Sequence, residues 1–238
     1  MTGIGTEPVG PGVPGERGGP GTAGRAGGPD AAGVPDAAGV PDAAILLGGG
    51  RAARLGGVDK PAIVVEGRSL ADRAFDAVHG CRPVIAVGPG SLARDGAVIV
   101  REDPPFGGPV AALAAGVAAL DAASGTGGSE ASAAAEWVLV LACDLPRAAS
   151  VVDALHGHPP VDADVDGLVL VDENGREQWL AGRYRIRALR GALAELSQTS
   201  GASMRKLVSS LSLVGIPDRA GASVDLDTWE DIHRYRDG

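Results

Sequence analysis

The chain has 238 residues, including 38 glycines and 17 prolines, and its formal net charge is −9 at pH 7. An acidic balance of this size argues against a nucleic-acid partner, because a general nucleic-acid binder carries a basic face. The apolar runs are too short to span a bilayer and the start does not have the pattern of a signal peptide, so we expect a cytoplasmic protein with no membrane partner.

The first 42 residues differ in composition from the rest. They contain 13 of the glycines and seven of the prolines, and residues 28–44 repeat the unit Pro-Asp-Ala-Ala three times. A segment with so few large apolar side chains cannot bury enough surface to offset the entropy lost on ordering. We therefore predict a disordered Gly/Pro-rich tail over residues 1–42 and one folded domain over residues 43–238.

The folded part alternates between apolar strands and helices. We expect strands at 44–47, 62–65, 83–87, 97–100 and 137–142, a hairpin or strand pair over 165–171 and 179–182, and helices at 69–79, 109–120, 183–197, 203–210 and 228–236. Strands that are apolar on both faces are typical of a mostly parallel, Rossmann-like sheet covered on both sides, a three-layer α/β/α fold. Ligands of such sheets bind beyond the carboxyl ends of the strands. The two cysteines, Cys81 and Cys143, are too few for a disulfide framework or a metal cluster, so we expect reduced thiols.

The strand at 44–47 runs into a glycine-rich loop, residues 47–60, with the sequence LGGGRAARLGGVDK. Glycines let backbone N–H groups approach and bind phosphate oxygens. A dinucleotide-binding fingerprint has similar spacing from Gly48 to Ala53, but Gly56, Gly57 and Pro61 leave no room for the helix that it needs.

Two other interpretations of the loop compete with a nucleotide site. A P-loop needs Ser or Thr after its lysine, whereas Lys60 precedes a proline, and a simple structural turn needs no cations. Only two of the 21 basic residues are lysines, Lys60 and Lys206. A compact ammonium suits a phosphate as a point charge, so a triphosphate-binding loop that ends in a dedicated lysine is favoured.

Three acidic segments follow predicted strands or precede helices. Residues 102–109 open a helix whose N-terminus would attract an anion, although Pro109 is also ordinary at a first helical turn. Asp144, at the end of the strand 137–142, is either a helix cap or a ligand for Mg²⁺, which takes one or two carboxylates plus substrate phosphates. Asp225 and Asp227 would point to the same side of an extended segment and one would complete such a metal site, although they also precede a helix start.

Taken together, these motifs resemble the molybdenum cofactor guanylyltransferases and their nucleotidyltransferase relatives. The loop is similar to the family's Leu-Ala-Gly-Gly, Arg, Met, Gly and Asp-Lys signature, with Gly48 where alanine is usual and Leu55 where methionine is usual. Residues 102–109 are similar to an aspartate followed by Gly-Pro-Leu-Ala-Gly, residues 142–146 to the metal-binding motif, and residues 225–231 to an Asp-x-Asp form of the last motif. The matches occur in order over almost all of residues 44–232.

The resemblance implies a sheet of the nucleotide-diphospho-sugar transferase type and a reaction that transfers GMP from GTP to molybdopterin-bound molybdenum cofactor, releasing pyrophosphate. It implies catalytic roles for Lys60 and Asp144, and Mg²⁺ held by Asp144 with Asp227 or Asp225. The nucleotide-binding residues that it implies are Leu47, Gly48, Gly49, Gly50, Arg54, Lys60, Asp103, Gly108 and Asp144. It also implies an acceptor side around residues 178–180 and 183–190, and transient contact with molybdoenzymes or their chaperones.

Other functions stay open on the sequence. One is the cytidylyltransferase of the same cofactor, and another is a sugar-phosphate nucleotidyltransferase with the same fold. A third is a non-catalytic nucleotide-binding module.

Overall fold

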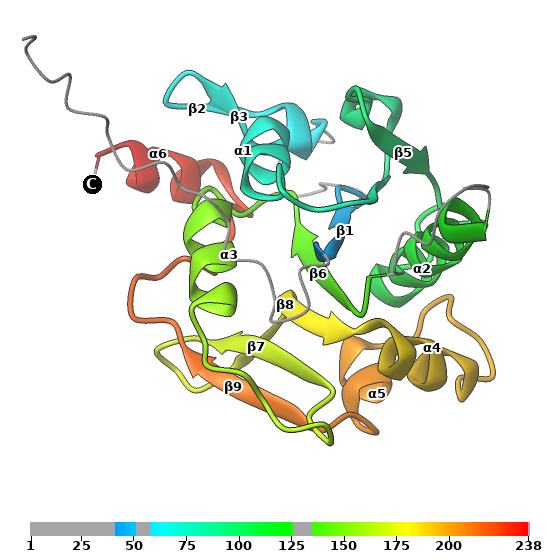
Figure 1. The fold of residues 1–238 in the computed structure, drawn as a ribbon. Helices are drawn as coiled ribbons and strands as arrows, with labels where there is room; N and C mark the ends of the chain where they lie inside the picture. The colour runs from blue at the N-terminus through cyan, green and yellow to red at the C-terminus, as the bar shows by residue number, and fades with distance from the viewer. Residues whose placement is uncertain (1–40, 51–57, 126–134, 238) are drawn as a thin grey trace, which may run out of the picture. The chain divides into compact units, whose positions relative to one another are not determined.

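A computed structural model describes residues 41–50, 58–125 and 135–237 (Figure 1). Its main sheet has seven strands in the order β5-β4-β1-β6-β8-β7-β9. The strands are β1 (Ala43–Leu47), β4 (Val84–Val87), β5 (Ala97–Val100), β6 (Trp137–Ala142), β7 (Gly167–Val171), β8 (Glu177–Arg185) and β9 (Leu213–Pro217). β8 is antiparallel to both of its neighbours, and the other neighbouring strands are parallel. The prediction of a mostly parallel sheet is confirmed.

Helices cover both faces of this sheet. α1 (Leu70–Ala77) and α3 (Ala148–His156) pack on one face, whereas α2 (Pro109–Gly125), α4 (Ile186–Ala194) and α5 (Met204–Val208) pack on the other. β1 is apolar throughout because its side chains alternate between the two cores: Ala44 and Leu46 lie in the first, Ile45 and Leu47 in the second. The three-layer α/β/α fold is therefore confirmed.

A small subdomain lies outside the main sheet. β2 (Val64–Val65) and β3 (Arg68–Ser69) form a two-stranded hairpin, preceded by the 3-10 helix η2 (Lys60–Ala62). The hairpin turn, Glu66-Gly67, has φ values of 51° and 78°, as a two-residue turn of this kind requires. Together with α1 and the last helix, α6 (Trp229–Asp237), the hairpin closes a separate apolar cluster around Ile232. The strand predicted at 62–65 is thus shorter than expected and belongs to another sheet.

The structure adds elements that the sequence pattern did not predict. These are α3, β3, β9 and the short 3-10 helices η2 and η3 (Gly90–Leu92). The helix predicted from residue 183 instead begins at Ile186, because β8 continues to Arg185. The guanidinium groups of Arg183 and Arg185 both lie over the ring of Trp137, at 4.7 and 4.3 Å from its centroid, so β8 accommodates two charges without leaving the sheet.

Asp42, which the composition assigned to the tail, has a buried side chain. Its carboxylate accepts hydrogen bonds from Arg183 Nε (2.6 Å) and Nη2 (2.9 Å) and contacts His156 Nε2 at 3.0 Å. The residue just before β1 is therefore part of the packed domain. Residues 1–40 of the predicted tail lie outside the described residues.

Both cysteines are free and buried, and burial raises the pKa of each thiol. Over the described part of the chain, no helix combines the length and the apolar character needed to cross a bilayer.

Candidate functional site

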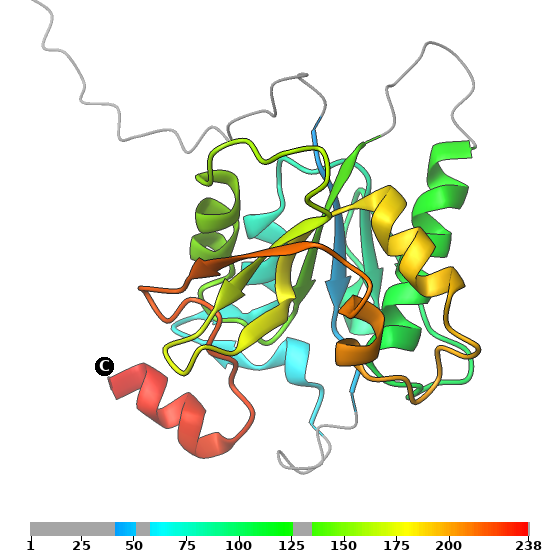
Figure 2. The same cartoon turned by 90° about the horizontal axis from the view of Figure 1, so that it is seen from below.

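The carboxyl ends of β1 and β6 bring the glycine loop and Asp144 together. The two strands are parallel, with Leu47 opposite Ala142, and the amide of Cys143 donates to the carbonyl of Leu47 at 2.9 Å. In Figure 2 the arrowhead of β1 points to the lower edge of the sheet, where the glycine loop begins. Since parallel strands end at the same edge, Gly48 and Asp144 lie side by side there.

Lys60 connects this edge to the C-terminal segment. Its ammonium Nζ donates to Asp144 Oδ2 at 2.7 Å and to Asp227 Oδ1 at 2.5 Å. Burial disfavours the charged ammonium, but the charges and hydrogen bonds of the two aspartates outweigh it, so the pKa of Lys60 is raised. The sequence predicted Lys60 as a phosphate ligand, and in the structure it neutralises the predicted metal ligands.

The segment around Leu226 supplies two carboxylates rather than one. The Leu226 side chain is buried, and its amide donates to the backbone carbonyl of Asp144 at 3.2 Å. Asp225 and Asp227 flank it, and together with Asp144 they offer three oxygens that lie within 4.8 Å of one another. Burial, followed by the negative charges of the other two aspartates, raises the pKa of Asp225. The sequence left the choice between Asp225 and Asp227 open, and the structure brings both to Asp144.

This cluster fits a divalent cation. Carboxylate oxygens are the ligands that hard cations such as Mg²⁺ prefer. Asp144 Oδ1 is buried and has no hydrogen-bond partner among the described residues, and Lys60 bonds to the other oxygen of the same carboxylate. A buried acceptor without a donor is costly, and a bound cation would satisfy it.

A cavity of about 510 Å³ lies on the glycine-loop side of Lys60. Its lining comes from the loops that follow β1, β4 and β5: Gly48, Gly49, Gly50, Val58, Asp59, Lys60, Pro61, Gly88, Pro89, Arg101, Glu102 and Phe106. The three predicted loop glycines therefore border one cavity together with Lys60.

Glycine at position 48 has a packing reason. A Cβ there would lie 2.6 Å from Leu92 Cδ1 and 3.1 Å from Pro61 Cγ, and the amide of Gly48 donates to the carbonyl of Val87 at 2.9 Å. Gly88 is equally tight, because its Cβ would lie 3.0 Å from the backbone of Gly48. The usual alanine would not fit at position 48 without a shift of these neighbours.

Not every predicted nucleotide ligand borders this cavity. Asp103 is exposed and Gly108 half-buried, and neither belongs to the lining, whereas the neighbouring Glu102 is buried and does. Leu47 is a core residue beneath the loop, and Arg54 lies outside the described residues. Glu102 and Phe106 are therefore lining residues that the motif contained and the prediction passed over.

A second cavity, of about 740 Å³, lies on the other side of Asp144. Its lining includes Asp144, Asp225, the β7–β8 turn and the start of β8 (residues 175–181), with Met204, Arg205 and Ser223. Residues 178–180, predicted on the acceptor side, are part of it, whereas Arg183–Arg190 are not. The lysine–aspartate cluster thus lies between two cavities.

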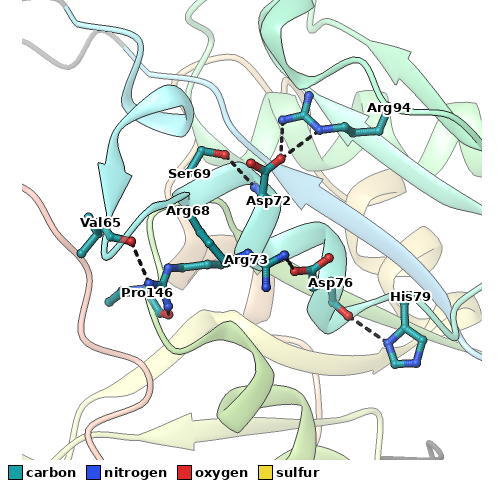
Figure 3. Close-up of polar contacts among 9 residues, drawn as sticks. All are labelled: Val65, Arg68, Ser69, Asp72, Arg73, Asp76, His79, Arg94 and Pro146. Carbon is teal, nitrogen blue, oxygen red and sulfur yellow. Dashed lines mark hydrogen bonds and ion pairs between the residues drawn. The ribbon is translucent and has the colours of Figure 1, made fainter.

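Helix α1 supports the loop that carries Asp144. Arg73 on this helix donates to the carbonyl of Val65 at 2.8 Å and to that of Pro146 at 3.4 Å, so it joins the hairpin to the loop after β6 (Figure 3). The side chain of Ser69 caps the helix by accepting from the amide of Asp72, whose carboxylate also binds Arg94 at 2.7 Å. The cap and the ion pair hold α1 in place, and from this helix Arg73 reaches the loop after β6.

Comparison with known proteins identifies the family. Residues 44–214 match the MobA-like NTP transferase domain. The chain belongs to this family. The match runs from β1 into β9 and includes the glycine loop, Lys60 and Asp144.

One curated relative agrees with this assignment. A molybdenum cofactor guanylyltransferase from Acidiphilium cryptum (strain JF-5) is 32% identical over 129 residues, which are 52% of this chain and 61% of that protein. The chain thus matches about three fifths of the length of this curated relative.

Two solved structures show the same fold as the chain. Rv0371c from Mycobacterium tuberculosis H37Rv has a TM-score of 0.58 at 19% identity, covers 84% of this chain and 99% of its own, and has also been solved in complex with manganese. Molybdopterin-guanine dinucleotide biosynthesis protein A from Archaeoglobus fulgidus has a TM-score of 0.57 at 18% identity and covers 82% and 96%. At these identities the two structures establish the shared fold.

Proposed function

We propose that the protein is a nucleotidyltransferase that transfers GMP from GTP to molybdopterin-bound molybdenum cofactor and releases pyrophosphate. The observation that carries the proposal is the contact of Lys60 with Asp144 and Asp227 between two cavities. The nucleotide would occupy the cavity lined by the glycine loop, and the acceptor would occupy the other. The family and the curated guanylyltransferase support this assignment.

The proposed reaction replaces one phosphoanhydride bond by another. An acceptor phosphate oxygen forms a bond to the α-phosphorus of GTP while the bond from that phosphorus to the bridging oxygen breaks, and pyrophosphate leaves with the electron pair. Catalysis of this kind rests on positioning and charge neutralisation rather than on covalent work by the protein.

Each part of the cluster has a role in this scheme. Backbone amides of Gly48–Gly50 would hold phosphate oxygens, because glycines leave the backbone accessible. The ammonium of Lys60 would offset negative charge on the triphosphate. A divalent cation held by Asp144 with Asp225 and Asp227, Mg²⁺ in our proposal, would supply further positive charge.

Glu102 supports guanine as the base. Its Oε1 accepts from the amide of Phe106 at 3.0 Å, and its Oε2 is buried without a hydrogen-bond partner among the described residues. The Watson–Crick edge of guanine presents two adjacent donors, N1–H and the 2-amino group. These suit the carboxyl group of Glu102, whose Oε2 has no donor among the described residues. Cytosine presents one donor beside the acceptor N3, which would face this carboxyl group unfavourably.

Pyrophosphate release with each of GTP, CTP, ATP and UTP in the presence of molybdenum cofactor tests the proposal. We expect turnover with GTP, and Glu102→Gln, which keeps the shape of the side chain, should reduce the preference for GTP. Turnover with CTP alone would identify the cytidylyltransferase instead. If no nucleotide reacts and GTP still raises the melting temperature, the protein is a binding module.

The proposal keeps two expectations from the sequence: a cytoplasmic location, and transient contact with molybdoenzymes or their chaperones, which the family resemblance implies.

A further inference from the structure

Phe106 has an unusual backbone and an unusual position. Its φ is 64°, in the left-handed region that bulky residues rarely adopt. Its side chain is 49% exposed and lines the cavity that we assign to the nucleotide. Strained residues of this kind persist where the surrounding contacts hold them, and they occur often at binding sites.

Contacts on both sides hold the loop around Phe106. Its amide donates to Glu102 Oε1 at 3.0 Å, and the guanidinium of Arg101 lies 5.6 Å from the centroid of its ring. The next residue, Gly107, is buried, and its carbonyl accepts from the amide of Gly201 at 2.8 Å. A Cβ at Gly107 would lie 2.8 Å from that of Ala111, so the chain cannot shift freely after Phe106.

We propose that the ring of Phe106 is the stacking surface for the nucleobase of the bound triphosphate. The inference rests on the proposed function, because it takes the first cavity as the nucleotide site. An exposed aromatic ring offers a face to a flat base. Glu102 Oε2, which has no hydrogen-bond partner in the described part of the chain, offers an acceptor to the edge of that base. Stacking tolerates every base, so Phe106 contributes affinity and Glu102 contributes selectivity.

Two substitutions distinguish the contribution of the ring from that of the backbone conformation. Phe106→Ala removes the ring and keeps a Cβ at the positive φ, whereas Phe106→Gly removes both. Loss of stacking should weaken GTP binding about 5- to 150-fold in each variant, and Phe106→Tyr should bind as the wild type does. Because glycine adopts this φ without strain, Phe106→Gly should melt about 2 to 8 °C above Phe106→Ala.

The probes are GTP and inorganic tripolyphosphate, titrated calorimetrically with Mg²⁺ into the full-length chain. Binding of tripolyphosphate should be the same in the wild type and in both variants, because this ligand has no base. GTP affinity unchanged in Phe106→Ala and Phe106→Gly would overturn the inference, and so would a wild type that binds GTP no more tightly than tripolyphosphate. If GTP binding depends on Phe106 but no pyrophosphate is released, the stacking role stands and the proposed transferase function fails.

Discussion

Replacing Lys60 by methionine tests the competition between its ammonium and a metal ion. Lys60 Nζ bonds to Asp144 and Asp227 at 2.7 and 2.5 Å, and both carboxylates belong to the cluster that fits a cation. A cation that binds this cluster without nucleotide competes with the ammonium for the negative charge of both carboxylates, even where it takes the oxygens that Lys60 does not bind, such as Asp144 Oδ1. A hydrogen bond to a charged group contributes about 1.5–3 kcal/mol, which corresponds to roughly 10- to 150-fold in affinity.

We therefore expect Lys60→Met to bind Mn²⁺ alone about tenfold or more tightly than the wild type. The concentration of free Mn²⁺, followed by electron paramagnetic resonance during a titration, measures this directly. Lys206→Met is the matched control, because Lys206 is exposed on α5 and is the only other lysine of the chain. Equal or weaker Mn²⁺ binding by Lys60→Met would refute the competition.

Three further predictions concern turnover, stability and the tail. Asp144→Asn should slow pyrophosphate release by about 100-fold or more, as loss of a preorganised charge typically does, and near-normal kinetics would remove Asp144 from the mechanism. Asp42→Asn should lower the free energy of unfolding by about 3 kcal/mol in urea titrations at pH 7, because the half-buried Arg183 loses the charge of the buried Asp42. Although burial opposes ionisation, hydrogen bonds from His156 and Arg183 lower the pKa of Asp42. The difference in unfolding free energy between wild type and Asp42→Asn should therefore persist above pH 4 and shrink as the pH falls further. A difference independent of pH would contradict this role of Asp42. Deletion of residues 1–40 should change neither turnover nor melting temperature, and a large loss of either would show that the tail has a structural role.

The parts of the fold that depend on burial followed from the sequence. β1 and β6 are apolar at every position because both of their faces are covered. A glycine run follows β1 and Asp144 lies just after β6, and both mark the end of the apolar strand in the sequence. β9 gave no such signal: it contains Gly215, and its side chains are half-buried or exposed. Its pairing with β7 is set by tertiary contacts that no local pattern shows.

At the site too, particular residues show what the sequence could not predict. Glu102 and Asp103 are adjacent carboxylates of the same motif, and only the path of the backbone after β5 decides that Glu102 turns into the cavity while Asp103 faces solvent. The sequence predicted a helix from residue 183, but Asp42 and Glu136, both distant along the chain, pair with Arg183 and Arg185 within the sheet. The spacing of the motifs in the sequence predicted which types of residue come together at the site. The packing of the chain decides which of two neighbouring residues makes each contact.

The central claim is tested most directly by following the α-phosphate. With GTP labelled at the α-phosphorus and molybdenum cofactor as acceptor, the account predicts that the label enters the cofactor product in step with pyrophosphate release, and that Asp144→Asn loses both together. Label that appears as free GMP, or that stays in GTP while the cofactor is present, would contradict it.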